Sequence, residues 1–147
     1  MKEMKIKLLT DTATVPMRAT EGSAGYDLRA DIKEAHVLKR GEIFAVPTGI
    51  AIALPDKSYV AVVCARSGLA IKHGISLANG VGIIDSDYRG EIKVGLINLG
   101  NEDFVIEPNE RIAQMLIMPV ETPVLSPSEE IEKTERGDGG FGSTGRR

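Results

Sequence analysis

Residues 91–96 read Glu91-Ile92-Lys93-Val94-Gly95-Leu96, and this stretch decides the fold. Apolar residues occupy every second position, which is typical of a β-strand with one buried and one wetter face. Short runs rich in Val, Ile and Leu recur on both sides of it at intervals of roughly ten residues, separated by Gly, Pro, Asn and Asp. The predicted strands are Lys5–Thr10, Ala35–Leu38, Ile43–Val46, Gly49–Leu54, Tyr59–Cys64, Ile92–Leu99, Phe104–Ile106 and Arg111–Met118.

Only one short helix is expected, over Gly68–His73, and Gly74 is placed to end it. Many short strands with few helices indicate an all-β fold, which can be a sandwich, a jelly roll or a barrel. The 147 residues are enough for one domain. A domain of that length buries roughly 68–70% of the surface that its unfolded chain exposes.

The composition of the chain changes after Pro119. Prolines, serines and glutamates dominate the next residues, which is typical of an extended arm. The sequence therefore predicts a β-domain over residues 1–119, an extended arm over 120–134 and a glycine-rich tail over 135–147, within a single domain overall. The tail has too little apolar content to order itself, yet its glycines, arginines and Phe141 suit a nucleotide. A plain disordered Gly/Ser tail is the alternative.

Charge and cysteine content exclude several classes of function. The net charge of −3 argues against general affinity for nucleic acid or for an anionic membrane. No apolar run approaches the ~18 residues that a membrane helix needs, and we expect no signal peptide. The single cysteine, Cys64, lies in an apolar run and is expected to be a buried small hydrophobe. A reducing compartment, the cytoplasm, is therefore expected.

Arg66-Ser67-Gly68 stands between a predicted strand and the predicted helix. A guanidinium, a hydroxyl and free backbone N–H groups at a helix N-terminus can surround an anion, and the helix dipole adds to the attraction. The alternative is structural, with Ser67 as a simple N-cap and Arg66 in a surface ion pair.

Asn79–Gly90 combines turn residues with groups that can read a nucleoside. Asn79 can offer both a donor and an acceptor to a base edge, and Tyr88 can pack its ring on a sugar. Asp85 can take a proton from water as a general base. The same residues are also ordinary hairpin-turn chemistry.

Two further segments carry polar groups among apolar neighbours. Gln114 interrupts an otherwise apolar strand, and a buried amide needs hydrogen-bond partners, either in the core or on a phosphate. Gly25 and Asp27 can shape a turn that enters a strand. Each of these segments is a weak signal by itself.

The order and spacing of five segments carry a resemblance. They are Ser23–Leu28, Arg66–Ala70, Asn79–Gly90, Glu110–Met115 and Arg136–Gly145. Together they resemble the five motifs of the trimeric dUTP pyrophosphatase (dUTPase) family, over nearly the whole chain. The resemblance implies a jelly-roll β-barrel homotrimer with three shared active sites, which hydrolyses dUTP to dUMP and pyrophosphate. One chain would supply the phosphate-binding segments, a second the uracil-binding hairpin and a third the tail.

The resemblance also implies roles for individual residues. Asp85 would activate the water that attacks the α-phosphorus. The phosphate-binding residues would be Arg66, Ser67, Gly68 and Gln114, joined from the tail by Arg136, Gly142, Ser143 and Thr144. The nucleoside would meet Asn79, Gly82, Ile83, Ile84, Tyr88 and Lys93, with Phe141 stacked on the uracil. Mg²⁺ would be held mainly by the triphosphate and water rather than by the protein, with Asp27 near its water shell.

Two other classes of protein fit parts of the sequence. A dCTP deaminase, from the same fold superfamily, would need a glutamate base where this chain has Gly95. A non-catalytic trimeric jelly-roll binding protein has no need of Asp85, Arg66 and Tyr88, all of which are present. The tripeptide Arg136-Gly137-Asp138 also resembles an adhesion motif, and we regard that match as coincidence.

Overall fold

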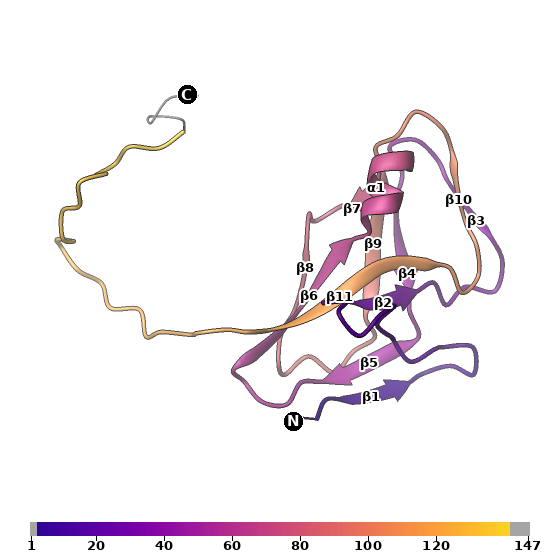
Figure 1. Ribbon diagram of the computed structural model, residues 1–147, viewed down its shortest axis with the longest axis horizontal. Coiled ribbons are helices and arrows are strands. Elements are labelled where there is room, and N and C mark those ends of the chain that lie inside the picture. Colours follow the sequence, from indigo (N-terminus) through magenta and orange to yellow (C-terminus); the bar gives the residue numbers. More distant parts are fainter. Residues whose placement is uncertain (1–2, 142–147) are drawn as a thin grey trace.

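The computed structural model of the chain describes residues 3–141. Its strands are β1 (Lys5–Leu8), β2 (Tyr26–Arg29), β3 (His36–Leu38), β4 (Ile43–Pro47), β5 (Ile50–Ala53), β6 (Tyr59–Ala65), β7 (Ile75–Leu77), β8 (Gly82–Ile84), β9 (Lys93–Asn98), β10 (Phe104–Ile106) and β11 (Arg111–Pro119). The only helix in this part of the chain is α1, Ser67–His73 (Figure 1). The predicted all-β fold with one short helix is confirmed.

All eight predicted strands are present, with ends that differ from the prediction by at most two residues. The sequence does not predict β2, β7 and β8. These strands are only four, three and three residues long. β2 and β8 also lie inside the segments whose glycines and polar residues indicate turns.

Two sheets make up most of the fold. One has four strands in the order β2-β11-β6-β8, and the other has three in the order β4-β9-β7. β1 pairs with β5, and β3 with β10. The last strand of the chain, β11, therefore lies inside the four-stranded sheet between β2 and β6, which are both much earlier in the sequence.

A single hydrophobic core receives side chains from both sheets. The four-stranded sheet contributes Leu28, Ala61, Val63 and Met115, and the three-stranded sheet contributes Val46, Val94, Leu96 and Leu77. In β9 the buried residues alternate strictly with more exposed ones, as the stretch at residues 91–96 predicts. The core therefore fixes which side chains of each strand remain outside.

The face of the four-stranded sheet that points away from this core is apolar as well. We call it the outer face, and it consists of Val62, Cys64, Ile83, Leu116 and Met118. Leu116, Val62 and Ile83 lie side by side across three strands. Ile83 is 56% exposed and Met118 is 45% exposed. Strands that are apolar on both faces are typical of sheets buried on both sides, so the outer face is suited to contact with another chain.

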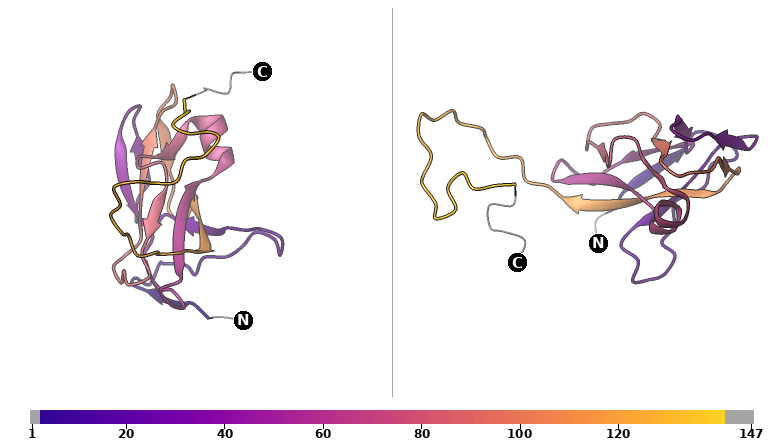
Figure 2. Two further views of the ribbon diagram at one scale, coloured as in Figure 1. Left: turned by 90° about the vertical axis from the view of Figure 1, so that its left-hand side faces the viewer. Right: turned by 90° about the horizontal axis from the view of Figure 1, so that it is seen from above.

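The chain leaves the β-domain at the end of β11. The Val120 backbone N–H donates to the Ser58 carbonyl over 2.9 Å, and residues 121–138 that follow are all exposed. Figure 1 and the right view of Figure 2 show this arm projecting away from both sheets. No helix among residues 3–141 has the length and apolar character required to cross a membrane.

Asn98, at the end of β9, is a fully buried polar side chain that closes the β9–β10 connection. Its amide nitrogen donates to the carbonyls of Leu38 and Glu102, each at 2.9 Å. Its amide oxygen accepts from the Gly100 N–H, also at 2.9 Å. One side chain thus provides hydrogen-bond partners for three backbone groups that would otherwise depend on water.

We expect Asn98→Ala to lower the free energy of unfolding by about 3 kcal/mol, because buried backbone groups would lose their partners. Urea unfolding at a fixed protein concentration measures this change. Asn101→Ala, at an exposed loop position nearby, is the control and should change the value by less than about 0.5 kcal/mol. Equal effects of the two substitutions would contradict this role of Asn98.

Candidate functional site

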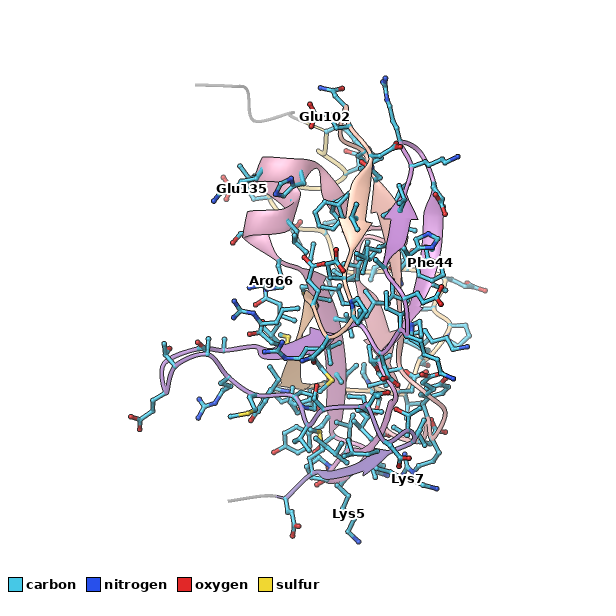
Figure 3. The ribbon with its side chains drawn as sticks, turned by 90° about the vertical axis from the view of Figure 1, so that its right-hand side faces the viewer. Lys5, Lys7, Phe44, Arg66, Glu102 and Glu135 are labelled. Atoms are coloured by element: carbon cyan, nitrogen blue, oxygen red, sulfur yellow. The ribbon has the colours of Figure 1, made fainter. Side chains whose placement is uncertain are left out.

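Four of the predicted phosphate-binding residues, Arg66, Ser67, Gly68 and Gln114, line one cavity of about 290 Å³, which we call the phosphate cavity. Its lining residues are Ala19, Ser23, Ala24, Gly25, Asp27, Arg66, Ser67, Gly68, Arg111 and Gln114. They come from β2, β11 and the start of α1, so three of the sequence segments meet here. Arg66 lies beside the first turn of α1 (Figure 3).

Asp27 joins two arginines at this cavity. Its Oδ1 lies 3.3 Å from Arg66 Nε, and its Oδ2 lies 3.1 Å from Arg111 Nη1. Arg66 also donates from Nη1 to the Arg111 carbonyl over 3.0 Å. The Asp27 side chain is only 17% exposed. One carboxylate therefore fixes the positions of two guanidinium groups and leaves the cavity with an excess of positive charge.

Arg111 is a cavity residue that sequence reasoning missed. In a regular strand Arg111 and Gln114, three positions apart, would face opposite sides of the sheet. The pairing of β11 with β2 shifts register between Arg111 and Ala113, so an irregularity occurs between them. This shift brings both side chains to the same cavity. The motif spacing alone contains no signal of it.

Gln114 is held in place on both sides. Its Nε2 donates to the Ala65 carbonyl over 3.1 Å. On the other side it lies against Gly25, where an added Cβ would come within 2.9 Å of the amide oxygen. Gly25 therefore serves a close approach, and the amide oxygen stays beside the cavity.

The start of α1 differs from the structural alternative. Arg66, in an extended conformation, is the N-cap residue, and no side chain caps the helix. The interpretation of Ser67 as an N-cap is therefore wrong, and Ser67 lines the phosphate cavity instead. The ion pair of Arg66 in that alternative is present, with Asp27 as the partner. Gly74 ends the helix as predicted, in the left-handed region with φ 71°.

The hairpin residues line a second cavity of about 440 Å³, the hairpin cavity. Its lining residues are Ile83, Ile84, Asp85, Tyr88, Glu91, Ile92 and Lys93. β8 is an edge strand of its sheet and pairs only with β6. Alternate backbone N–H and C=O groups along Ile83 and Ile84 therefore point outward from the open edge of the sheet. Asp85 follows directly at the end of this edge.

Tyr88 has a fixed position in the hairpin. Its hydroxyl donates to the Glu91 carbonyl over 2.9 Å, and its ring lies against Gly90 so closely that any Cβ there would overlap it. Glu91 in turn accepts from the Gly49 N–H at 3.0 Å and lies 3.8 Å from Lys93 Nζ. These contacts hold one wall of the hairpin cavity against the β4–β5 turn.

The two cavities share no lining residue, so one chain does not bring all the predicted site residues together. Asn79 lies in the turn before β8, and Gly82 begins that strand, but neither lines the hairpin cavity. Arg136 and Phe141 are on the tail and line neither cavity. Gly142, Ser143 and Thr144 lie outside the described residues.

No group of three or more His, Cys, Asp or Glu within residues 3–141 is arranged to hold a metal ion. Asp27 is the carboxylate of the phosphate cavity, and both its oxygens already face arginines. These residues therefore fit a metal that arrives bound to phosphate oxygens better than one held by protein carboxylates.

Comparison with known proteins gives a consistent result. The dUTPase family model matches residues 11–145. A deoxyuridine 5'-triphosphate nucleotidohydrolase of Neisseria meningitidis serogroup C is 54% identical over 145 residues, covering 97% of each chain. The Rickettsia canadensis protein of the same name is 58% identical over 139 residues, covering 95% of this chain and 93% of its own. The dUTPase of Staphylococcus bacteriophage 80alpha with dUPNHPP superimposes with a TM-score of 0.89 at 30% identity, covering 97% of this chain and 98% of that one.

Family model, sequence relatives and structural neighbour agree over nearly the full length of the chain, and the same segments form the two cavities described above. The chain belongs to the dUTPase family.

Proposed function

We propose that this protein hydrolyses dUTP to dUMP and pyrophosphate. The observation that carries the proposal is the presence, in a member of the dUTPase family, of two complementary cavities. One is rich in arginine and backbone donors, which suits a triphosphate. The other combines an exposed strand edge, an aromatic ring and a carboxylate, which suits a deoxynucleoside next to its reacting phosphorus.

In the phosphate cavity the chain's task is to bind and orient the triphosphate. Arg66 and Arg111 supply charge, and the Ser67 hydroxyl, the Gly68 N–H and the Gln114 amide supply hydrogen bonds. Phosphoryl transfer depends mainly on positioning and on neutralising charge in the transition state. Since Asp27 already orients both arginines, little reorganisation is needed when the substrate binds.

In the hairpin cavity the chain reads the base and holds the water. The backbone edge at Ile83 and Ile84, with Asn79, presents donors and acceptors to uracil. Cytosine has the opposite pattern and would leave groups buried without partners. Tyr88 lies against the deoxyribose and leaves no room for a 2′-hydroxyl. Asp85 accepts the proton of the water that attacks the α-phosphorus.

Mg²⁺ is the cofactor that this arrangement suits. When bound to the triphosphate it cancels part of the phosphate charge and so favours attack on the α-phosphorus. The residues of this chain contribute at its edge only, through Asp27 near its water shell. We also infer a cytoplasmic location, which is consistent with the single cysteine, Cys64.

We further propose a homotrimer with shared active sites. The two cavities lie toward opposite ends of the outer face: Gln114, two residues before Leu116 on β11, lines the phosphate cavity, and Ile83 and Asp85 line the hairpin cavity. A head-to-tail contact through this apolar face brings the phosphate cavity of one copy to the hairpin cavity of the next. Such heterologous contacts form a closed ring when the rotation between copies allows it.

The arm and tail complete the site in this proposal. Residues 120–134 can span up to ~3.3 Å per residue, which is enough to reach a neighbouring copy. The tail, residues 135–147, then covers a site formed by other copies, with Arg136, Ser143 and Thr144 on phosphates and Phe141 on uracil.

Deamination is disfavoured by the same geometry. The position where a dCTP deaminase would carry its glutamate is Gly95, in the middle of β9 opposite Ala45. No carboxylate is available there to move protons to and from the base.

The reaction itself is tested by measuring pyrophosphate release from dUTP, dCTP, dTTP and UTP in parallel. We expect dUTP to be preferred over dCTP by about 10⁴-fold or more in kcat/KM, because polar base edges discriminate strongly. Removal of Mg²⁺ with EDTA should lower the rate with dUTP, and added Mg²⁺ should restore it. Equal rates with all four nucleotides would contradict the proposal.

Asp85→Asn should lower kcat by at least about 10²-fold, because the general base is lost while its shape is kept. The Kd of the non-hydrolysable analogue dUpNHpp should stay within about threefold, since binding does not need the proton transfer. Asp87→Asn, at an exposed position in the same turn, is the matched control and should retain near-normal kcat. A near-normal kcat for Asp85→Asn would exclude its role as the base.

Deletion of residues 134–147 should lower kcat/KM for dUTP by about a hundredfold or more, because the groups that close the site are lost. Light scattering should give the mass of a trimer both for the full chain and for the truncated one. Normal dUTP hydrolysis by the truncated protein would rule out the proposed role of the tail, and a monomer mass for the full chain would rule out shared sites.

A further inference from the structure

The chain between β8 and β9, residues 85–92, carries Asp85 and Tyr88 to the hairpin cavity. Several of its hydrogen bonds stay inside this segment. The Tyr88 N–H donates to the Asp85 carbonyl over 3.2 Å, and Arg89 Nη1 donates to the Ser86 carbonyl over 2.8 Å. Local bonds of this kind shape the turn, but they do not fix its position relative to the sheets. A contact with another element has to do that.

Glu91 makes such a contact through its side chain. Its Oε1 accepts from the Gly49 N–H over 3.0 Å, across 42 residues of sequence. Its Oε2 lies 3.8 Å from Lys93 Nζ, so both carboxylate oxygens face a partner. The Lys93 side chain is more than half exposed, and an ion pair of that kind contributes little in water. The hydrogen bond to Gly49 is therefore the contact that fixes the Glu91 side chain.

Gly49, in the β4–β5 turn, is a firm point of attachment. Its φ is 65°, in the left-handed region, and any Cβ there would overlap the Asp31 carboxylate and the Ala13 side chain. Its carbonyl accepts from the Leu9 N–H over 2.8 Å. The turn is thus held between neighbouring segments of the β-domain, and a group that bonds to it has a defined position.

The start of β9 is held independently of the Glu91 side chain. The Ile92 N–H donates to the Ile50 carbonyl over 2.9 Å, and the Ile92 carbonyl accepts from Thr48 Oγ1 over 2.5 Å. Ile92 is also fully buried in the core. Loss of the Glu91 carboxylate therefore leaves β9 in place and releases only the turn that precedes it.

Tyr88 takes its position from Glu91. Its hydroxyl donates to the Glu91 carbonyl over 2.9 Å, and its ring lies against Gly90. Tyr88 is 44% exposed, and both of these contacts come from the turn itself. A displacement of Glu91 therefore displaces the ring of Tyr88.

We propose that Glu91 is a positioning residue for the selection of the sugar. Its carboxylate holds the turn against Gly49, and its carbonyl holds the Tyr88 hydroxyl, so the ring stays where a 2′-hydroxyl does not fit. Glu91 acts through Tyr88 rather than on the reacting atoms. This proposal rests on the proposed function, in which Tyr88 lies against the deoxyribose.

The relative hydrolysis of dUTP and UTP tests this role. Pyrophosphate release in the presence of Mg²⁺ gives kcat/KM for both nucleotides with one preparation of each variant. The ratio of the two values does not depend on how much of the protein is folded, so a merely structural role would not change it. We expect Glu91→Ala to lower the ratio for dUTP over UTP by about tenfold or more, because a misplacement of about 1 Å in a site can cost ~10²-fold in rate. An unchanged ratio would overturn the proposal.

Glu91→Gln is the conservative variant. Its amide oxygen can still accept from the Gly49 N–H, whereas the charge that faces Lys93 is lost. We expect its ratio to stay within about threefold of that of the unchanged protein, because an exposed ion pair contributes little. Glu34→Ala, at an exposed glutamate that lines neither cavity, is the matched control and should leave the ratio as it is. A loss in Glu91→Gln as large as in Glu91→Ala would also overturn the proposal, since charge rather than position would then control the selection.

A measurement that needs no nucleotide separates this proposal from the proposed function. The chain has three tyrosines, so labelling with 3-fluorotyrosine gives three ¹⁹F signals, and Tyr88→Phe identifies the signal of Tyr88. We expect Glu91→Ala to shift or broaden that signal and to leave those of Tyr26 and Tyr59 in place. An unchanged Tyr88 signal in a protein that hydrolyses dUTP means that the proposal fails while the function stands. A displaced Tyr88 signal in a protein that does not hydrolyse dUTP supports the anchoring by Glu91 while the function fails.

Discussion

The pairing of β11 with both β2 and β6 is the constraint on which the site depends. Three segments that are far apart in the sequence become neighbours only because the last strand of the β-domain lies between two early ones. The carboxylate of Asp27 then meets the guanidinium groups of Arg66 and Arg111, and one ion-pair cluster joins β2, β11 and the start of α1, directly after β6. The same hydrogen bonds that build the sheet therefore build the phosphate cavity.

The sequence predicts most of the fold because its main signals are local. The alternation in residues 91–96 and the apolar runs mark eight strands, and Gly74 marks the end of the helix. The three strands it does not predict, β2, β7 and β8, are short and begin at or directly after a glycine, where pairing with neighbours, rather than local preference, decides the structure. Strand pairing is a non-local property, and the sequence pattern does not contain it.

The sequence likewise predicts one part of the candidate site, while the other part depends on strand pairing. Motif order identifies Arg66, Ser67, Gln114 and the hairpin residues, and the structure gathers all of these except Asn79 and Gly82 around two cavities. The shift in β11 that adds Arg111 could not be foreseen, since it depends on how β11 pairs with β2. Asp27 illustrates a related limit. Its position in a motif indicates importance, but its contact with two arginines emerges only once three strands are aligned.

The phosphate and hairpin cavities have no residue in common. Under the proposed assembly this has a genetic consequence. A copy defective in Arg66 still offers an intact hairpin, and a copy defective in Asp85 still offers an intact phosphate cavity. Two inactive alleles can therefore complement each other within one ring, where each mixed trimer regains a single working interface. Conversely, a copy that assembles but carries a damaged tail impairs a site that belongs to its neighbours. Selection on this protein thus acts on the ring of copies, and an allele's effect depends on the allele beside it.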